Sequence, residues 1–221
     1  MASRILVPTK GAESWRPLLG DPSRHWRDDY SAKATAYAWE DARGLPGDIA
    51  AALGDGTELL LAIPEHKVEM PGRGADSQCD VFALCRRDDT LIAAAIEAKV
   101  NESFGPTLGE WLAEGGENRQ ARIDRIASDL GGSKPASELR YQLFHRTAAA
   151  VYEARRFGAG EAAMIVQSFS PERRWKEDFD AFAQWIGTSG DATSTTAVLP
   201  GSLTLRLAWV SSPMPDTRGR P

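Results

Sequence analysis

The chain has 221 residues, of which 42% are hydrophobic and 26% charged, a composition typical of a globular protein with a sizeable core. Its longest apolar runs, near Leu59–Ile63 and Leu91–Ile96, are too short to cross a bilayer, and its first residues lack the apolar stretch of a secretory signal. The formal net charge of −5 gives no support to tight, nonspecific nucleic-acid binding, although it leaves room for a local basic groove. Cys79 and Cys85 lie on one extended segment and cannot pair with each other, which favours reduced thiols in a cytoplasmic protein.

The first part of the chain predicts an irregular arm followed by helices. Residues 1–29 hold tryptophans and prolines among polar residues, so we expect short helices or an arm there. Ser31 can cap a helix over residues 32–43, which Gly44 ends. A short helix is expected over residues 48–53.

Three extended segments follow. Residues 58–68 predict a strand in which Pro64 requires an edge position or a bulge. Residues 77–100 consist of two apolar segments around the polar link 86–89, a pattern that predicts a β-hairpin.

The length of the hairpin loop decides which residues face each other. A two-residue loop at residues 88–89 places Arg87 opposite Thr90, and the same register places Asp80 opposite Glu97. A bulge or a three-residue loop would instead move Asp80 to the other face of the sheet.

This register brings charged side chains together. Since side chains alternate along a strand, Glu97 and Lys99 share a face, and Asp80 joins them from the partner strand. Two carboxylates about 5 Å apart repel by roughly 3 kcal/mol at an effective dielectric constant near 20. Protonation, a nearby cation or a bound metal relieves this repulsion, and oxygen atoms are the ligands that Mg²⁺ takes. The hairpin therefore predicts a metal site with a lysine beside it.

The second half of the chain predicts helices over residues 108–113, 117–130 and 137–157, a buried strand over 162–169, a helix that starts at Ser170, and a strand over 203–210. Residues 188–201 are expected to form a polar link, and residues 212–221 a disordered tail. Residues 1–211 are then one α/β domain with an N-terminal arm.

The motif of Asp80 followed on the next strand by Glu97-Ala98-Lys99 resembles that of the PD-(D/E)XK nuclease superfamily, whose fold is restriction-endonuclease-like. The resemblance extends over roughly residues 31–169, because the helix, the three-stranded meander, the later helix and the next strand follow in that order. Cys79 stands before the aspartate in place of the proline of the motif, which many members also lack. The whole chain also looks like an uncharacterised group of bacterial proteins. The resemblance implies a mixed central β-sheet flanked by helices and metal-dependent hydrolysis of phosphodiester bonds in nucleic acid.

Carried over by residue, the resemblance implies that Asp80 and Glu97 ligate Mg²⁺ or Mn²⁺ and that Lys99 positions the attacking water or stabilises charge on the phosphate. Some members add a glutamate from the first helix, for which Glu40 is the candidate. The RecB-like branch adds a glutamine followed four residues later by a tyrosine. Gln142 fits that glutamine, but Arg146 follows it. Cleavage of both strands of a duplex would favour a homodimer.

Weaker patterns leave alternatives open. Gln142, His145 and Arg146 share a helix face and could meet phosphate or order the site, or they could face solvent. The arginines at 119, 122 and 125 are interpreted as a solvated face in preference to a phosphate-binding one. The second Glu-x-Lys copy, residues 65–67, is interpreted as strand surface.

Two other functions remain open. One is a module of the same fold that binds a partner or nucleic acid without cutting it. The other is an enzyme on a small phosphorylated substrate, which the acidic isoelectric point would suit.

Overall fold

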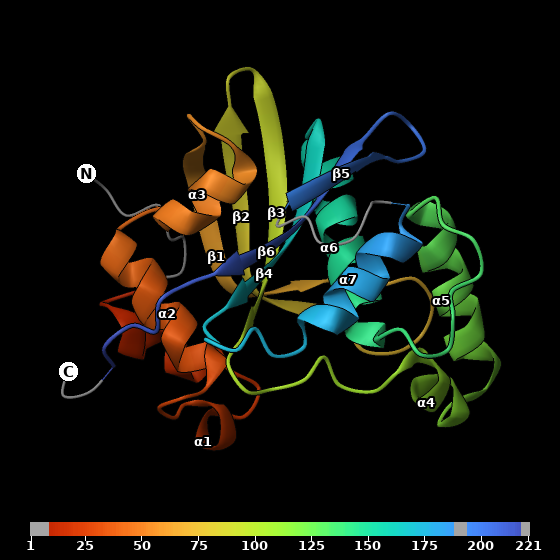
Figure 1. Ribbon diagram of the computed structural model, residues 1–221, viewed down its shortest axis with the longest axis horizontal. Coiled ribbons are helices and arrows are strands. Elements are labelled where there is room, and N and C mark those ends of the chain that lie inside the picture. The colour runs from red at the N-terminus through yellow and green to blue at the C-terminus, as the bar shows by residue number, and fades with distance from the viewer. Residues whose placement is uncertain (1–8, 188–193, 218–221) are drawn as a thin grey trace.

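The computed structural model describes residues 9–187 and 194–217, and within them the chain forms a mixed sheet with helices on both faces (Figure 1). The strand order of this six-stranded sheet is β1-β2-β3-β4-β6-β5. The strands are β1 (Glu58–Val68), β2 (Ser77–Arg87), β3 (Thr90–Lys99), β4 (Glu161–Ser168), β5 (Ser194–Val198) and β6 (Thr204–Ser211). The predicted α/β class with a mixed sheet is confirmed.

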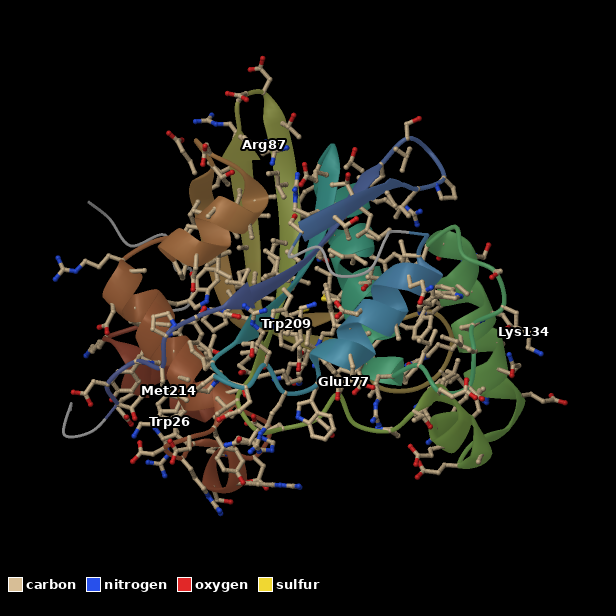
Figure 2. The ribbon with its side chains drawn as sticks, viewed as in Figure 1. Trp26, Arg87, Lys134, Glu177, Trp209 and Met214 are labelled. Carbon is tan, nitrogen blue, oxygen red and sulfur yellow. The ribbon has the colours of Figure 1, made fainter. Side chains whose placement is uncertain are left out.

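The helices form two layers. They are η1 (Ala12–Leu18, a 3₁₀-helix), α1 (Pro22–His25), α2 (Ser31–Ala42), α3 (Gly47–Leu53), α4 (Leu108–Ala113), α5 (Gly116–Asp129), α6 (Tyr141–Phe157) and α7 (Lys176–Trp185). Apolar residues of η1, α2 and α3 pack on one face of the sheet, and those of α5, α6 and α7 pack on the other. Figure 2 shows Trp209 of β6 inside the second layer, where its ring contacts Phe104 and Phe179. No helix of the described residues is long and apolar enough to cross a membrane.

The β2–β3 hairpin has the predicted register. Arg87 lies opposite Thr90 and Val81 lies opposite Ile96, so the count of residues from the turn is the expected one. The strand β1 pairs with β2 at the edge of the sheet, which is where Pro64 is tolerated.

The strand β4 runs parallel to β3, and helix α6 lies between them in the chain. All eight residues of β4 are buried, as expected of a strand covered on both faces. Helix α6 ends at Gly158, whose φ of 64° is a left-handed conformation that glycine adopts without strain. This crossover places the first turn of α6 beside the end of β3.

Two helices start later than the sequence suggested. Helix α6 begins at Tyr141 instead of residue 137, because the carbonyls of Ser137 and Leu139 accept hydrogen bonds from the first residues of α4. Helix α7 begins at Lys176 instead of Ser170, because Trp175 before it has a φ of 69° and interrupts the helical path. The seryl hydroxyl at 170 still accepts a hydrogen bond from the backbone nitrogen of Arg174.

The polar segments near the C-terminus include a strand and contacts with the rest of the domain. Part of the expected link forms β5, which pairs antiparallel with β6, while residues 188–193 lie outside the described residues. In the expected tail, the Ser212 nitrogen donates to the Ser168 carbonyl and the Thr217 hydroxyl donates to Asp28. Residues 212–217 of the expected tail thus make these two contacts with the rest of the domain. Residues 218–221, like residues 1–8 of the expected arm, lie outside the described residues.

Candidate functional site

Three acidic residues form a row across β1, β2 and β3. The ladder between β2 and β3 is regular up to Val81 and Ile96, and the next step in that register places Asp80 beside Glu97. On the other side of β2, Asp80 falls between the partners of Pro64 and His66, so Glu65 lies beside it. Glu65 has a φ of 53°, which takes its backbone out of the extended path at this step.

Glu65 corrects the sequence interpretation, which assigned the second Glu-x-Lys copy to strand surface. The side chain of Glu65 lines the same cavity as Asp80 and Glu97 and is half-buried. The sequence placed Glu65 on the strand before the hairpin, but the register of that strand against β2 became known only from the structure. Lys67 of the same copy is exposed, as expected.

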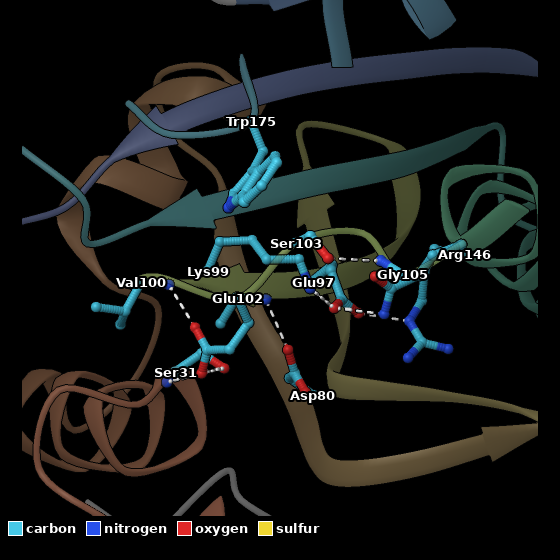
Figure 3. A network of polar contacts seen from close by, with 12 residues as sticks. Ser31, Asp80, Glu97, Lys99, Val100, Glu102, Ser103, Gly105, Arg146 and Trp175 are labelled. Carbon is cyan, nitrogen blue, oxygen red and sulfur yellow. Dashed lines mark hydrogen bonds and ion pairs between the residues drawn. The ribbon is translucent and has the colours of Figure 1, made fainter. Parts of the chain in front are cut away.

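The cavity has a volume of about 370 Å³ and lies where β3 ends. Besides the three acids it is lined by Lys99, by Gln142 and Arg146 from the first turns of α6, and by Ser31 and Ala32 at the start of α2. Figure 3 shows the polar groups of this region. Four of the five predicted catalytic residues, Asp80, Glu97, Lys99 and Gln142, are thus brought to one cavity.

Glu97 is held by three donors. Its Oε1 accepts hydrogen bonds from the Lys99 ammonium group and, at 2.8 Å, from Gln142 Nε2, and its Oε2 accepts one at 2.5 Å from Arg146 Nε (Figure 3). Burial opposes ionisation, but the charges of Arg146 and Lys99 outweigh it and lower the pKa of Glu97 to about 2. Glu97 is therefore a fixed carboxylate.

Asp80 and Glu65 are in the opposite electrostatic situation. Burial and the charge of Glu97 raise the pKa of Asp80 to about 7, and burial and the charge of Asp80 raise the pKa of Glu65 to about 8. Asp80 Oδ2 accepts a hydrogen bond of 2.6 Å from the Ala98 nitrogen, and Glu65 Oε2 accepts one of 2.7 Å from Gln78. The row has more negative charge than its neighbours neutralise, which a cation would relieve.

Arg146 occupies the position where the resemblance leads us to look for a tyrosine. Its Nη1 donates at 2.8 Å to the hydroxyl of Ser77, whose oxygen also lies 2.9 Å from His145 Nδ1. The expectation that Gln142, His145 and Arg146 share a face is met, and this face turns inward. The connection of His145 and Arg146 through Ser77 was not predicted, because nothing in the local sequence of β2 indicates the contact.

Glu40 is the predicted site residue that the structure places elsewhere. Its Oε1 accepts a hydrogen bond of 2.7 Å from Trp15 Nε1 and so holds η1 against α2. Only the start of α2 reaches the cavity, and Glu40 lies about 13 Å further along the helix axis than Ser31, at 1.5 Å per residue. Glu65 takes the place in the cavity that the sequence assigned to Glu40.

Glu102 also lines the cavity, but its two oxygens are already engaged. Oε1 accepts hydrogen bonds from the backbone nitrogen and hydroxyl of Ser31, and Oε2 accepts them from the nitrogens of Val100 and Asn101 (Figure 3). Glu102 thereby fastens the start of α2 to the end of β3.

Some of the carboxylate oxygens that line the cavity are free to bind a hard divalent cation, and others are not. Within residues 9–187 and 194–217, no three His, Cys, Asp or Glu side chains are grouped closely enough to hold a metal as they stand. Asp80 and Glu65 each keep one carboxylate oxygen that accepts no hydrogen bond within the described part of the chain. Carboxylate oxygens are the ligands of Mg²⁺, so these two side chains fit the ion, and Glu97 would join them by releasing one of its donors.

Residues 8–214 match a domain of unknown function (DUF6946), and the chain belongs to this family. No curated protein and no solved structure matches the chain.

Proposed function

We propose that this protein is a nuclease-like enzyme with a restriction-endonuclease-like core that hydrolyses phosphodiester bonds in nucleic acid with the help of Mg²⁺ or Mn²⁺. The observation that carries the proposal is the convergence of Asp80, Glu97 and Lys99 on one cavity at the end of β3. The succession of α2, the meander β1-β2-β3, α6 and the parallel strand β4 agrees with the element order that the resemblance implies.

Each side chain then has a role. Asp80 and Glu97 would hold the cation, with Glu65 as a third acid. When bound, such an ion lowers the pKa of a water ligand and offsets charge on the phosphate oxygens. Lys99 carries a positive charge at the same end of the row, where it would stabilise charge on the phosphate. Gln142 holds the orientation of Glu97 through its hydrogen bond to Oε1.

The test is cleavage of plasmid, single-stranded DNA and RNA with Mg²⁺ or Mn²⁺ by the wild type and by two lysine variants. Lys99→Ala should lower the rate by at least about a hundredfold, since it removes a positive charge that would stabilise the negative charge of the transition state. Lys67→Ala is the matched control, because Lys67 belongs to the other Glu-x-Lys copy and is exposed.

The outcomes separate clearly. Metal-dependent cleavage that Lys99→Ala abolishes and Lys67→Ala preserves supports the proposal and locates the site. Cleavage that survives Lys99→Ala unchanged would point to a contaminating nuclease and overturn the assignment.

A second function, binding without cutting, is favoured by one specific observation. Both oxygens of Glu97 are already occupied by Lys99, Gln142 and Arg146, which is also how a purely structural buried charge is satisfied. A wild-type protein that binds nucleic acid but cuts none of the substrates with either metal would establish this alternative.

A further inference from the structure

A second cavity lies between the loop at residues 70–76 and helices α4, α5 and α6. Its volume is about 270 Å³, and its lining shares no residue with the cavity at Glu97. Three arginines line it, at positions 73, 119 and 122, against one acid, Asp76. The described lining therefore has a net positive charge, in a protein whose formal net charge is −5.

Arg122 is the centre of this charge. It is buried, and its guanidinium group is fixed by hydrogen bonds of 2.9 Å from Nε to the Pro71 carbonyl and from Nη1 to the Ala75 carbonyl. The buried Nη2 has no hydrogen-bond partner within the described residues. A buried arginine with no carboxylate partner is costly, and an anion in the cavity would compensate its charge.

This finding corrects the interpretation of the arginines of α5 as a solvated face. Arg122 is buried, and Arg119 lines the cavity with its guanidinium group 5.0 Å from the ring of Trp111. Arg125 is the exception, since it is exposed and pairs with Asp129 at 2.9 Å. The interpretation failed because the loop at residues 70–76 folds over α5, which the local sequence of α5 does not reveal.

The aromatic residues of the cavity form a wall. Trp111 and Tyr141 stack with ring centroids 3.6 Å apart, Arg119 covers Trp111, and His145 lies 4.9 Å from Tyr141. Since these faces already have neighbours, the wall offers little room for a base to stack. The cavity is therefore better suited to the anionic backbone of a ligand than to its bases.

The two cavities are connected by hydrogen bonds. His145 lines the second cavity, and its Nδ1 lies 2.9 Å from the Ser77 hydroxyl. Arg146 joins Ser77 to Glu97 in the first cavity. The side chains that line the two cavities are therefore neighbours in one network of hydrogen bonds between α6, β2 and β3.

We propose that the cavity around Arg122 is a phosphate-binding subsite for the nucleic-acid strand whose phosphodiester bond is cleaved at the neighbouring cavity. Its substrate class rests on the proposed function, but the binding site rests on the arginines. Arg122 supplies the fixed charge and Arg73 adds charge from the rim. Arg119 adds charge from the wall, where its Nη1 also lies 3.3 Å from the exposed Glu114 carboxylate and donates to the Trp111 carbonyl.

The experiment is fluorescence anisotropy with a labelled single-stranded DNA oligonucleotide in EDTA, so that metal-dependent cutting does not interfere. The variant Arg73→Ala/Arg119→Ala should bind about tenfold more weakly, and the slope of log Kd against log salt should fall by about 0.7 for each phosphate charge that the variant no longer neutralises. Arg125→Ala is the matched control from the same helix and should bind like the wild type. Arg122→Lys keeps the charge and should bind more tightly than Arg122→Met, which removes it.

Inorganic phosphate alone is the second probe, read out as a shift in melting temperature. Phosphate could raise the melting temperature of the wild type but not of Arg73→Ala/Arg119→Ala, while the wild type binds no oligonucleotide. The cavity would then be a site for free phosphate, and its assignment to a nucleic-acid strand would be overturned. Equal oligonucleotide binding by the wild type and the arginine variants would also overturn it.

The two proposals fail in different ways. Binding that depends on the arginines in a protein that never cuts would support the subsite and contradict the proposed function. If cleavage depended on Lys99 but the arginine variants bound the oligonucleotide like the wild type, the proposed function would stand and the subsite proposal would be contradicted.

Discussion

Glu97 and Glu161 are both buried, and each is held between two basic side chains, but they lie at opposite ends of the parallel strands β3 and β4. Glu97 is held by Lys99 and Arg146. Glu161 is held by Arg87, at 2.7 Å, and by Arg206, at 2.5 Å. Their side chains are equally inaccessible to solvent, with 4% exposed in each case.

The surroundings of the two glutamates differ. Around Glu161, two arginines face one acid, and they also bond to the Leu53 carbonyl and the Ser194 hydroxyl. Around Glu97, two further acids join from β1 and β2, and all three line one cavity. A buried ion pair alone therefore does not indicate function, and the proposed metal site rests instead on the further acids that share a cavity with Lys99.

The largest expected effect is on cleavage. Glu97→Gln should lower the metal-dependent rate by about a thousandfold or more, because it removes a proposed metal ligand. Glu161→Gln should leave the rate within about threefold, since Glu161 is far from the cavity. Rates from one plasmid assay check both variants, and an equal loss of activity in the two would break the comparison.

On stability, the two variants should instead behave alike. Each leaves two basic side chains, buried around Glu97 and partly buried around Glu161, without their shared carboxylate, so each should lower the free energy of unfolding by about 3 kcal/mol. Urea denaturation at neutral pH measures both. If only Glu161→Gln lowered the free energy of unfolding, the charge of Glu97 would not contribute to the stability of the fold.

The next effect concerns pH. The raised pKa values of Asp80 and Glu65, about 7 and about 8, mean that the folded protein binds more protons than the unfolded chain at intermediate pH. Stability from these groups is therefore present at about pH 4 and is lost as the pH rises to about pH 8. Glu97, whose pKa is lowered to about 2, behaves oppositely, and its contribution is lost progressively as the pH falls from about 4.5 to about 2.

Asp80→Asn should reduce this loss. In EDTA at about pH 8 the variant should be more stable than the wild type by on the order of 1 kcal/mol, and near pH 4 the two should converge. Urea denaturation at both pH values gives the comparison. If the stabilities of the two proteins depended on pH in the same way, the pKa of Asp80 would not be raised in the folded protein.

The smallest effect sets the baseline for an exposed pair on the same sheet. Arg86 and Glu58 lie 3.1 Å apart, and more than half of each side chain is exposed. Arg86→Ala should change the free energy of unfolding by no more than about 0.5 kcal/mol. If Arg86→Ala lowered the free energy of unfolding as much as Glu161→Gln, burial would not explain why one ion pair stabilises the fold more than the other.

The sequence was most informative where local pattern determines structure. The hairpin register followed from one polar link at residues 86–89, and it placed Asp80, Glu97 and Lys99 on one face. The α/β class followed from apolar periodicity and from the uninterrupted apolar run that became β4.

Contacts between distant segments could not be predicted in the same way. Glu65 and Glu40 were assigned the wrong places because the pairing of β1 with β2, and the depth to which α2 enters the cavity, depend on the packing of the whole domain. Arg122 appeared solvated because the loop that covers it is some fifty residues earlier in the chain.

The central claim is that the acidic row around Asp80 attracts a divalent cation, and calorimetric titration with Mn²⁺ tests it most directly. The wild type and Glu161→Gln should bind Mn²⁺ with similar affinity, and Asp80→Asn should bind at least about tenfold more weakly. Absence of binding by the wild type, or equal binding by all three proteins, would contradict the account.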